Sequence, residues 1–121
     1  MATFYYTKTH EYIKDADGSF YLGITSHAAH ELGDITYVEL PAVGAQFAAG
    51  EECCTVESVK AVAPVNAPVA LKISGVNNRL EDSPELLNKD AQGEAWIATV
   101  ELNRAELAGL MDQAAYDAFE K

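Results

Sequence analysis

The chain has 121 residues, of which 49% are hydrophobic, and its 19 acidic and 8 basic side chains give a formal net charge of −11. This length fits one domain with a single core, expected over residues 1–121, and the hydrophobic content is too high for a disordered chain. A chain of this charge repels phosphate backbones, so we expect no nucleic-acid partner and favour partners with basic surfaces.

The first clear strand pattern leads into a short helix. Residues 20–25 are rich in strand formers and follow turn residues at 17–18. Thr25 or Ser26 can cap a helix with its hydroxyl, and Gly33 can end that helix just after residue 32. The pattern therefore predicts a turn, a strand and a short helix in this order.

The middle of the chain predicts short strands separated by proline and glycine. Residues 35–40 alternate apolar and polar side chains, and Pro41 ends this strand. The apolar region 53–76 is broken by Pro64 and Pro68, because proline cannot donate to a strand ladder. Several strands, not one, are therefore expected here.

The last third of the chain predicts helices around one more strand. Residues 83–85 (Ser-Pro-Glu) are a helix start with a capping hydroxyl, a proline at the first helical position and an acid, and this helix should end near Asn88. Residues 94–100 predict a strand. Apolar residues at three- and four-residue spacing over 107–119 predict a helical region laid on the sheet and broken near 111–112. The whole pattern predicts a mostly β fold, a small sandwich or barrel with a helical C-terminus.

The two cysteines and the N-terminal segment indicate a cytoplasmic protein. No uncharged run approaches the roughly 18 residues of a membrane span, and no basic region followed by an apolar stretch opens the chain. Cys53 and Cys54 are adjacent, so their Cα atoms would lie ~3.8 Å apart, too close for an ordinary disulfide. We expect two reduced, buried thiols, and a buried thiol describes Cys54 better than a catalytic nucleophile does.

The most apolar stretch of the chain has a lysine at its centre. Residues 53–65 read CCTVESVKAVAPV, which is longer than the usual strand of ~5–6 residues. Burying an unpaired ammonium is costly, so Lys60 should reach water from a sheet edge or project from a bend. No Gly, Asn, Asp or Pro lies between Thr55 and Ala63 to favour a turn. From the residues alone, a solvated structural lysine and a lysine at a hairpin both remain open.

Short strings along nearly the whole chain together resemble one protein family. Around the lysine stands Glu57-Ser-Val-Lys60-Ala. The others are Thr9-His10-Glu11-Tyr12, Gly23-Ile24-Thr25, Leu32-Gly33-Asp34-Ile35, Val38-Glu39-Leu40-Pro41, Ala67-Pro68-Val69, Val76-Asn77, Ser83-Pro84-Glu85-Leu86 and Gly93-Glu94-Ala95-Trp96-Ile97. Each string is weak alone, but in this order they resemble the glycine cleavage system H protein family, and the lysine string resembles its lipoyl attachment site.

The resemblance implies both a fold and a function. The fold is a lipoyl/biotinyl-type flattened barrel or sandwich (a barrel-sandwich hybrid) with short helices, and Lys60 stands at the tip of a hairpin with strands at 54–56 and 62–65. The function is that of a carrier, not an enzyme. Lipoate attached to Lys60 takes an aminomethyl group from glycine decarboxylase (P protein) to the aminomethyltransferase (T protein), and dihydrolipoamide dehydrogenase (L protein) reoxidises it. Lipoate-attaching enzymes are further partners, and a monomer with no metal and no membrane partner is expected.

The resemblance also implies roles for residues around the lysine. Glu57 would help the lipoate-attaching enzyme recognise the hairpin, and its alternative role is that of a solvated strand residue. Thr9, Glu11, Ile24 and Leu32 match positions of the groove where the loaded arm rests. Glu11 would pair there with a ligand ammonium. For Ile24 and Leu32, plain core packing is the alternative and the favoured main role.

Three positions depart from the family pattern. Pro64 stands where members often carry an acid, and Glu31 stands where some carry a histidine. These two differences predict a groove with a different polar set. Leu71 stands where a glycine is usual, and Gly75 comes later, which predicts a local rearrangement such as a β-bulge.

Other functions and sites remain as alternatives. A biotin carrier also modifies a hairpin lysine, but methionines usually flank that lysine, whereas Val59 and Ala61 do so here. A relay protein that donates lipoate to other complexes and an unmodified binding module on the same scaffold stay open. His27 and His30 could place two metal ligands on one helix face, but without a third ligand in the pattern, surface histidines are favoured.

Overall fold

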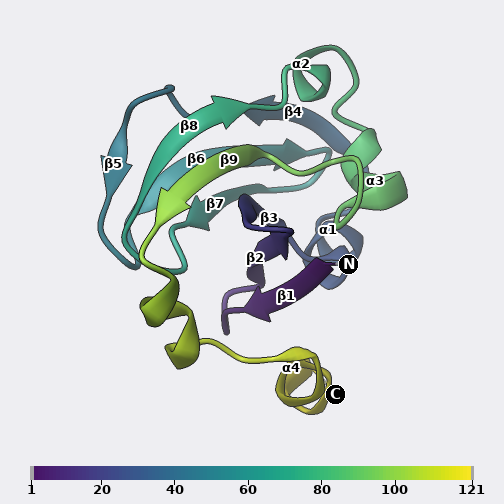
Figure 1. Ribbon diagram of the computed structural model, residues 1–121. Helices are drawn as coiled ribbons and strands as arrows, with labels where there is room; N and C mark the ends of the chain where they lie inside the picture. The colour runs from purple at the N-terminus through teal and green to yellow at the C-terminus, as the bar shows by residue number, and fades with distance from the viewer. Residues whose placement is uncertain (1, 121) are drawn as a thin grey trace.

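The computed structural model describes residues 2–120, where nine strands form two antiparallel sheets (Figure 1). One sheet has six strands in the order β1-β2-β3-β9-β8-β5, and the other has three in the order β4-β6-β7. The strands are β1 Ala2–Tyr6, β2 Glu11–Ala16, β3 Ser19–Ile24, β4 Ile35–Glu39, β5 Gln46–Phe47, β6 Glu52–Ser58, β7 Val62–Asn66, β8 Leu71–Val76 and β9 Ala98–Leu102. The helices are α1 Ser26–Leu32, α2 Arg79–Asp82, α3 Leu86–Asp90, the 3-10 helix η1 Arg104–Gly109 and α4 Gln113–Glu120. The predicted mostly β sandwich is confirmed.

The core lies between the two sheets. Leu22 and Ile73 from the larger sheet and Val38, Val56 and Val65 from the smaller one are at most 1% exposed. Their alternation along each strand places every second side chain inside, as a sandwich requires. The three-stranded sheet is therefore anchored on its inner face, up to the base of the β6–β7 hairpin.

A second, aromatic cluster holds the C-terminal helix. Tyr6, Tyr12 and Tyr116 are buried together, and the rings of Tyr6 and Tyr116 stack with centroids 4.3 Å apart. The backbone of Met111 pairs with that of Tyr6 through hydrogen bonds of 2.8 and 3.0 Å. The helical tail is thus broken between η1 and α4, as predicted, and α4 lies beside β1 (Figure 1).

Helix α1 begins and ends as the sequence predicts. Thr25 is its N-cap, and the Thr25 hydroxyl accepts a hydrogen bond from the backbone N–H of Ala28 at 3.1 Å. Gly33 follows the last turn with φ of 81°, a conformation that favours glycine. The helix is therefore short and fixed at both ends, and its last turn lies next to the hairpin that carries Lys60.

The strand predicted over residues 94–100 is wrong at its start. It begins only at Ala98, because the Asn77 side-chain amide donates to the carbonyls of Glu94 and Trp96 at 2.9 and 2.8 Å. These two carbonyls are therefore bonded to a side chain instead of a strand. Strands β1 and β2 were not predicted from the sequence, where the first expected strand is the one over residues 20–25.

The helix predicted from residue 83 begins later. It spans Leu86–Asp90, and no side-chain hydrogen bond caps it. Instead the backbone N–H of Leu86 donates to the carbonyl of Ser83 at 3.1 Å. A backbone turn thus takes the place that the Ser83 hydroxyl was expected to fill.

Pro64 does not break its strand, which corrects the prediction, whereas Pro68 lies between β7 and β8 as expected. Pro64 pairs with Thr55 inside β7. This strand is an edge of the three-stranded sheet, where a missing N–H is tolerated. The predicted rearrangement after Leu71 is present as a register shift between Ile73 and Gly75 in the pairing with β9.

Gly23 gives a test of the packing between β2 and β3. A Cβ at Gly23 would lie 2.5 Å from the hydroxyl of Tyr12, which is fully buried and donates to the Ala91 carbonyl at 2.9 Å. Because this ring cannot move away freely, Gly23→Ala should lower the free energy of unfolding by about 1–3 kcal/mol in urea titrations. Gly109→Ala is the control, since nothing lies within 4 Å of its added Cβ. Equal stability of the two variants would contradict this packing.

Candidate functional site

The β6–β7 hairpin turns at Ser58 and exposes the residues between its strands. The Ser58 N–H donates to the Ala61 carbonyl at 2.8 Å. The Ser58 hydroxyl oxygen in turn accepts from the N–H groups of Lys60 and Ala61 at 3.3 and 3.1 Å. A serine hydroxyl can close a turn in this way without glycine, and neither Val59 nor Lys60 has a positive φ. Ser58 is therefore a turn signal in the sequence that a search for Gly, Asn, Asp and Pro does not find.

Lys60 lies at the tip of this hairpin with its side chain exposed. The N–H of Val59 donates to the Asp34 carbonyl at 3.0 Å, which ties the tip to the loop after α1. The stem passes Gly33, where a Cβ would lie 3.6 Å from the Lys60 Cε. Within residues 2–120 no ion pair or hydrogen bond engages the Lys60 ammonium. The strands on either side match the expected 54–56 and 62–65, so the lysine is not buried in its apolar stretch.

A cavity of about 290 Å³ lies between α1 and the same hairpin. The structure brings all four predicted groove residues to its lining: Thr9, Glu11, Ile24 and Leu32. Two of the three departures from the family pattern, Glu31 and Pro64, line it as well, whereas Leu71 does not. Val56 contributes from the hairpin itself. The cavity is therefore the place where the predicted groove residues and the lysine hairpin meet.

Glu11 is a buried carboxylate on the wall of this cavity. Its side chain is 2% exposed, and Oε1 accepts hydrogen bonds from the hydroxyls of Thr7 (2.7 Å) and Thr9. Oε2 accepts from the backbone N–H of Asn66 at 3.2 Å. These donors satisfy the carboxylate, yet no Lys or Arg of the described chain pairs with it. The arrangement leaves a fixed negative charge that can attract a cationic ligand. Thr7 and Asn66 were not predicted as part of this site, since no motif of the sequence marks them.

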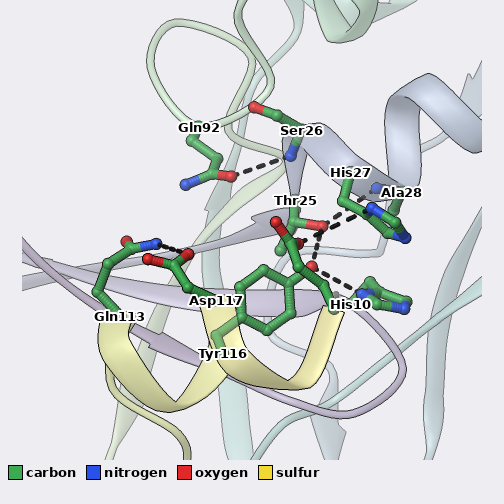
Figure 2. Close-up of polar contacts among 10 residues, drawn as sticks. His10, Thr25, Ser26, His27, Ala28, Gln92, Gln113, Tyr116 and Asp117 are labelled. Carbon is green, nitrogen blue, oxygen red and sulfur yellow. Dashed lines mark hydrogen bonds and ion pairs between the residues drawn. The ribbon is translucent and has the colours of Figure 1, made fainter.

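A polar cluster joins the cavity to α4 (Figure 2). The Tyr116 hydroxyl lies 2.7 Å from His10 Nδ1 and 2.8 Å from the Thr25 hydroxyl that caps α1. The rings of His10 and His27 are 4.6 Å apart between centroids, and both residues line the cavity. His27 Nδ1 lies 3.8 Å from Glu120 Oε2 on α4. The C-terminal helix is thus connected to the wall of the cavity.

The histidines and cysteines do not form a site of their own. His27 contacts His10, while His30 is exposed, and no group of three His, Cys, Asp or Glu residues within residues 2–120 could hold a metal ion. Cys53 and Cys54 are free and buried, as predicted, and burial raises the pKa of both thiols to about 12. Such thiols stay protonated at neutral pH and are poor nucleophiles.

Glu57 lies on β6 next to the turn. Its side chain is half-buried, and it pairs across the sheet with Tyr37 on β4 and Val62 on β7. This position is on the outer face of the three-stranded sheet, outside the lining of the cavity. Glu57 and the groove residues therefore lie on separate surfaces, both of which adjoin the Lys60 hairpin.

Comparisons with known proteins agree with one another. A family model described as "Glycine cleavage H-protein" matches residues 4–121. The glycine cleavage system H protein of Thermotoga maritima is 47% identical over 115 residues, which cover 94% of this chain and 93% of that protein. That of Methylocella silvestris is 47% identical over 123 residues, covering 100% of this chain and 98% of that protein. The crystal structure of a glycine cleavage system H protein from Mycobacterium marinum superposes with a TM-score of 0.84 at 33% identity, covering 97% of this chain and 95% of that one.

Ser58 can be tested as the residue that closes the turn. Ser58→Ala removes the acceptor of the Lys60 and Ala61 N–H groups and should lower the free energy of unfolding by about 1 kcal/mol. Ser58→Asn keeps a side-chain acceptor that can form the same kind of turn and should recover most of this loss. Urea unfolding measures both. If Ser58→Ala matched the wild type, the hydroxyl would have no role in the turn.

His10 predicts a pH dependence of stability. Burial lowers the pKa of His10, and the nearby His27 lowers it further, so the folded chain holds this proton less well than the unfolded chain, whose histidine pKa is ~6.5. The stabilisation is therefore present above ~pH 6.5 and is lost as the pH falls toward the lower folded pKa. His10→Asn keeps a residue suited to the φ of 68° but removes this titration.

The measurement is the midpoint temperature of thermal unfolding, followed as the pH is lowered from about 7.5 to about 5.5. The fall in this midpoint should be smaller for His10→Asn than for the wild type. His30→Asn, at an exposed position of α1, is the matched control and should follow the wild type. An undiminished fall in His10→Asn would contradict the assignment.

Proposed function

The chain belongs to the glycine cleavage H-protein family, the non-catalytic lipoyl carriers of the glycine cleavage system, and from this premise we propose that Lys60 is the residue that carries the lipoyl group. The observation that supports this most directly is an exposed amine that has no partner among residues 2–120 and lies at the tip of a hairpin beside the cavity. Lys14, by comparison, donates to the Gln92 carbonyl at 3.3 Å and lies over the rings of Phe4 and Tyr21.

The residues around Lys60 fit a lipoyl group. Lys60, whose amine would form the amide, is exposed, and the cavity has apolar walls from Ile24, Leu32 and Val56 that suit an aliphatic chain. When attached, the group supplies a redox-active disulfide for the P, T and L proteins, which are the glycine decarboxylase, the aminomethyltransferase and the dihydrolipoamide dehydrogenase of the system. The chain itself supplies the attachment point, the reach of an exposed tip and the surfaces that partners recognise.

The cavity is the proposed docking groove of the arm. Glu11 would accept hydrogen bonds from a cationic amine at the end of the arm, and Thr7 and Thr9 hold its carboxylate in place. Ile24 and Leu32 would exclude water from this contact. Because Pro64 replaces an acid of the family pattern, Glu11 is the buried carboxylate that the groove offers, and the exposed Glu31 adds a second one at its rim.

Further expectations belong to the same proposal. Glu57 would contribute to recognition by the lipoate-attaching enzyme, as its place beside the turn allows. One lipoyl-carrier domain over residues 1–121, a monomeric state and a cytoplasmic location stay predictions. Within residues 2–120, no helix has the length and apolar character needed to cross a bilayer.

Lys60→Arg tests the attachment site. Arginine keeps the positive charge at an exposed position, so the variant should unfold at the wild-type temperature. It should gain no lipoyl group by intact-mass measurement, because its guanidinium stays protonated, and it should support no glycine-dependent CO₂ release with the P, T and L proteins. Lys72→Arg, an exposed lysine on β8, is the control and should behave as the wild type. Glycine-dependent turnover by Lys60→Arg would contradict the proposal, whereas unfolding of this variant would make the lysine structural.

A further inference from the structure

Large apolar side chains are exposed around the Lys60 hairpin. Of the five such side chains that are strongly exposed within residues 2–120, three lie on the three-stranded sheet or at its tip: Tyr37 at 49%, Val59 at 69% and Val62 at 64%. The other two, Val43 and Phe119, lie on a loop and on α4. Scattered exposed apolar residues are ordinary, but a group beside one proposed modification site points to an interaction.

The strand register places two of these side chains, Tyr37 and Val62, in one row with Glu57. Tyr37, Glu57 and Val62 are paired across β4, β6 and β7. The next row contains Val38 and Val56, which are buried in the core, so the alternation of side chains puts the Tyr37–Glu57–Val62 row on the outer face. Residues 59 and 60 follow directly after this row at the turn. We call Tyr37, Glu57, Val59 and Val62 the tip face.

The segment that forms the three-stranded sheet is acidic apart from Lys60. Between residues 34 and 66 the only basic residue is Lys60, while the acids are Asp34, Glu39, Glu51, Glu52 and Glu57, of which Glu57 belongs to the tip face. An acidic surface of this kind attracts a partner with basic side chains and repels a second copy of the same surface. An apolar centre with a charged rim is also the usual anatomy of a specific interface. The fitting partner therefore has an apolar patch surrounded by lysines or arginines.

We propose that the tip face is the docking surface of the enzyme that acylates Lys60, and that Tyr37 and Val62 supply its apolar contacts. This inference rests on the proposed lipoylation of Lys60. In that step the Lys60 amine attacks the carbonyl of an enzyme-bound lipoyl adenylate. The C–N amide bond forms, the C–O bond to the adenylate phosphate breaks and AMP leaves with its electron pair, and the neutral amine loses one proton to solvent. The acylating enzyme binds the chain while Lys60 is still unmodified. The tip face adjoins Lys60 whether or not the cavity is occupied, so it is available to this enzyme.

The test measures acylation of the unmodified chain by a purified lipoate–protein ligase with ATP and lipoate. Tyr37→Thr and Val62→Thr reduce the apolar area while keeping residues that favour strands. Val43→Thr is the matched control, because Val43 is 63% exposed but lies outside the sheet. Initial rates followed by intact mass should show the KM for the chain raised at least about fivefold in each tip-face variant, with kcat near the wild type. Val43→Thr should keep the wild-type KM.

Other results would contradict either the lipoylation of Lys60 or the role of the tip face. A wild-type chain that gains no lipoyl group contradicts the proposed function itself. If the wild type is lipoylated but the tip-face variants have the same KM as Val43→Thr, the assignment of Lys60 stands and the tip-face proposal is contradicted. The proposal is also contradicted if the variants impair only the reaction with glycine decarboxylase. It is likewise contradicted if sedimentation shows that the wild type is a dimer and that the variants dissociate it. Circular dichroism controls for folding, and Val59→Thr at the tip replaces a variant that fails to fold.

Discussion

The position of Lys60 depends on the hydrogen bonds that close the β6–β7 hairpin at Ser58. The Ser58 hydroxyl accepts from two backbone N–H groups of the turn, and the Val59 N–H is held by the Asp34 carbonyl. These bonds let an apolar stretch reverse its direction without glycine or proline. The strands on either side still bury Val56 and Val65 in the core. A lysine at the centre of this stretch can therefore stand in water at no desolvation cost.

The hairpin separates two surfaces that have different chemistry. On one side, the cavity against α1 holds the buried carboxylate of Glu11, and the network of His10, Thr25 and Tyr116 connects its wall to the C-terminal helix. On the other side, the outer face of the smaller sheet is apolar and acidic. In the proposed function, the cavity would hold the arm and the tip face would bind a partner.

Local signals in the sequence predicted some elements well. Thr25 and Gly33 fixed both ends of α1, because capping acts within a few residues. The family resemblance predicted the hairpin, and the four residues that it assigned to a groove line one cavity in the structure. Contacts between residues far apart in the chain could not be predicted from local sequence signals. The Asn77 side chain donates to the carbonyls of Glu94 and Trp96, which would otherwise have extended β9. The contact of Asn66 with Glu11 is made by a backbone N–H, so the type of residue at position 66 does not predict it. Pro64 was misjudged because the sequence does not tell an edge strand from a central one.

The central claim is that one particular amine among the lysines of this chain is the one that the ligase acylates. The most direct measurement is peptide mapping by mass spectrometry of the wild-type chain after incubation with a lipoate–protein ligase, ATP and lipoate. The account predicts a single lipoyl group, located on the peptide that contains Lys60. A lipoyl group on a peptide with Lys8, Lys14, Lys72 or Lys89, or a chain that accepts biotin instead of lipoate, would contradict it.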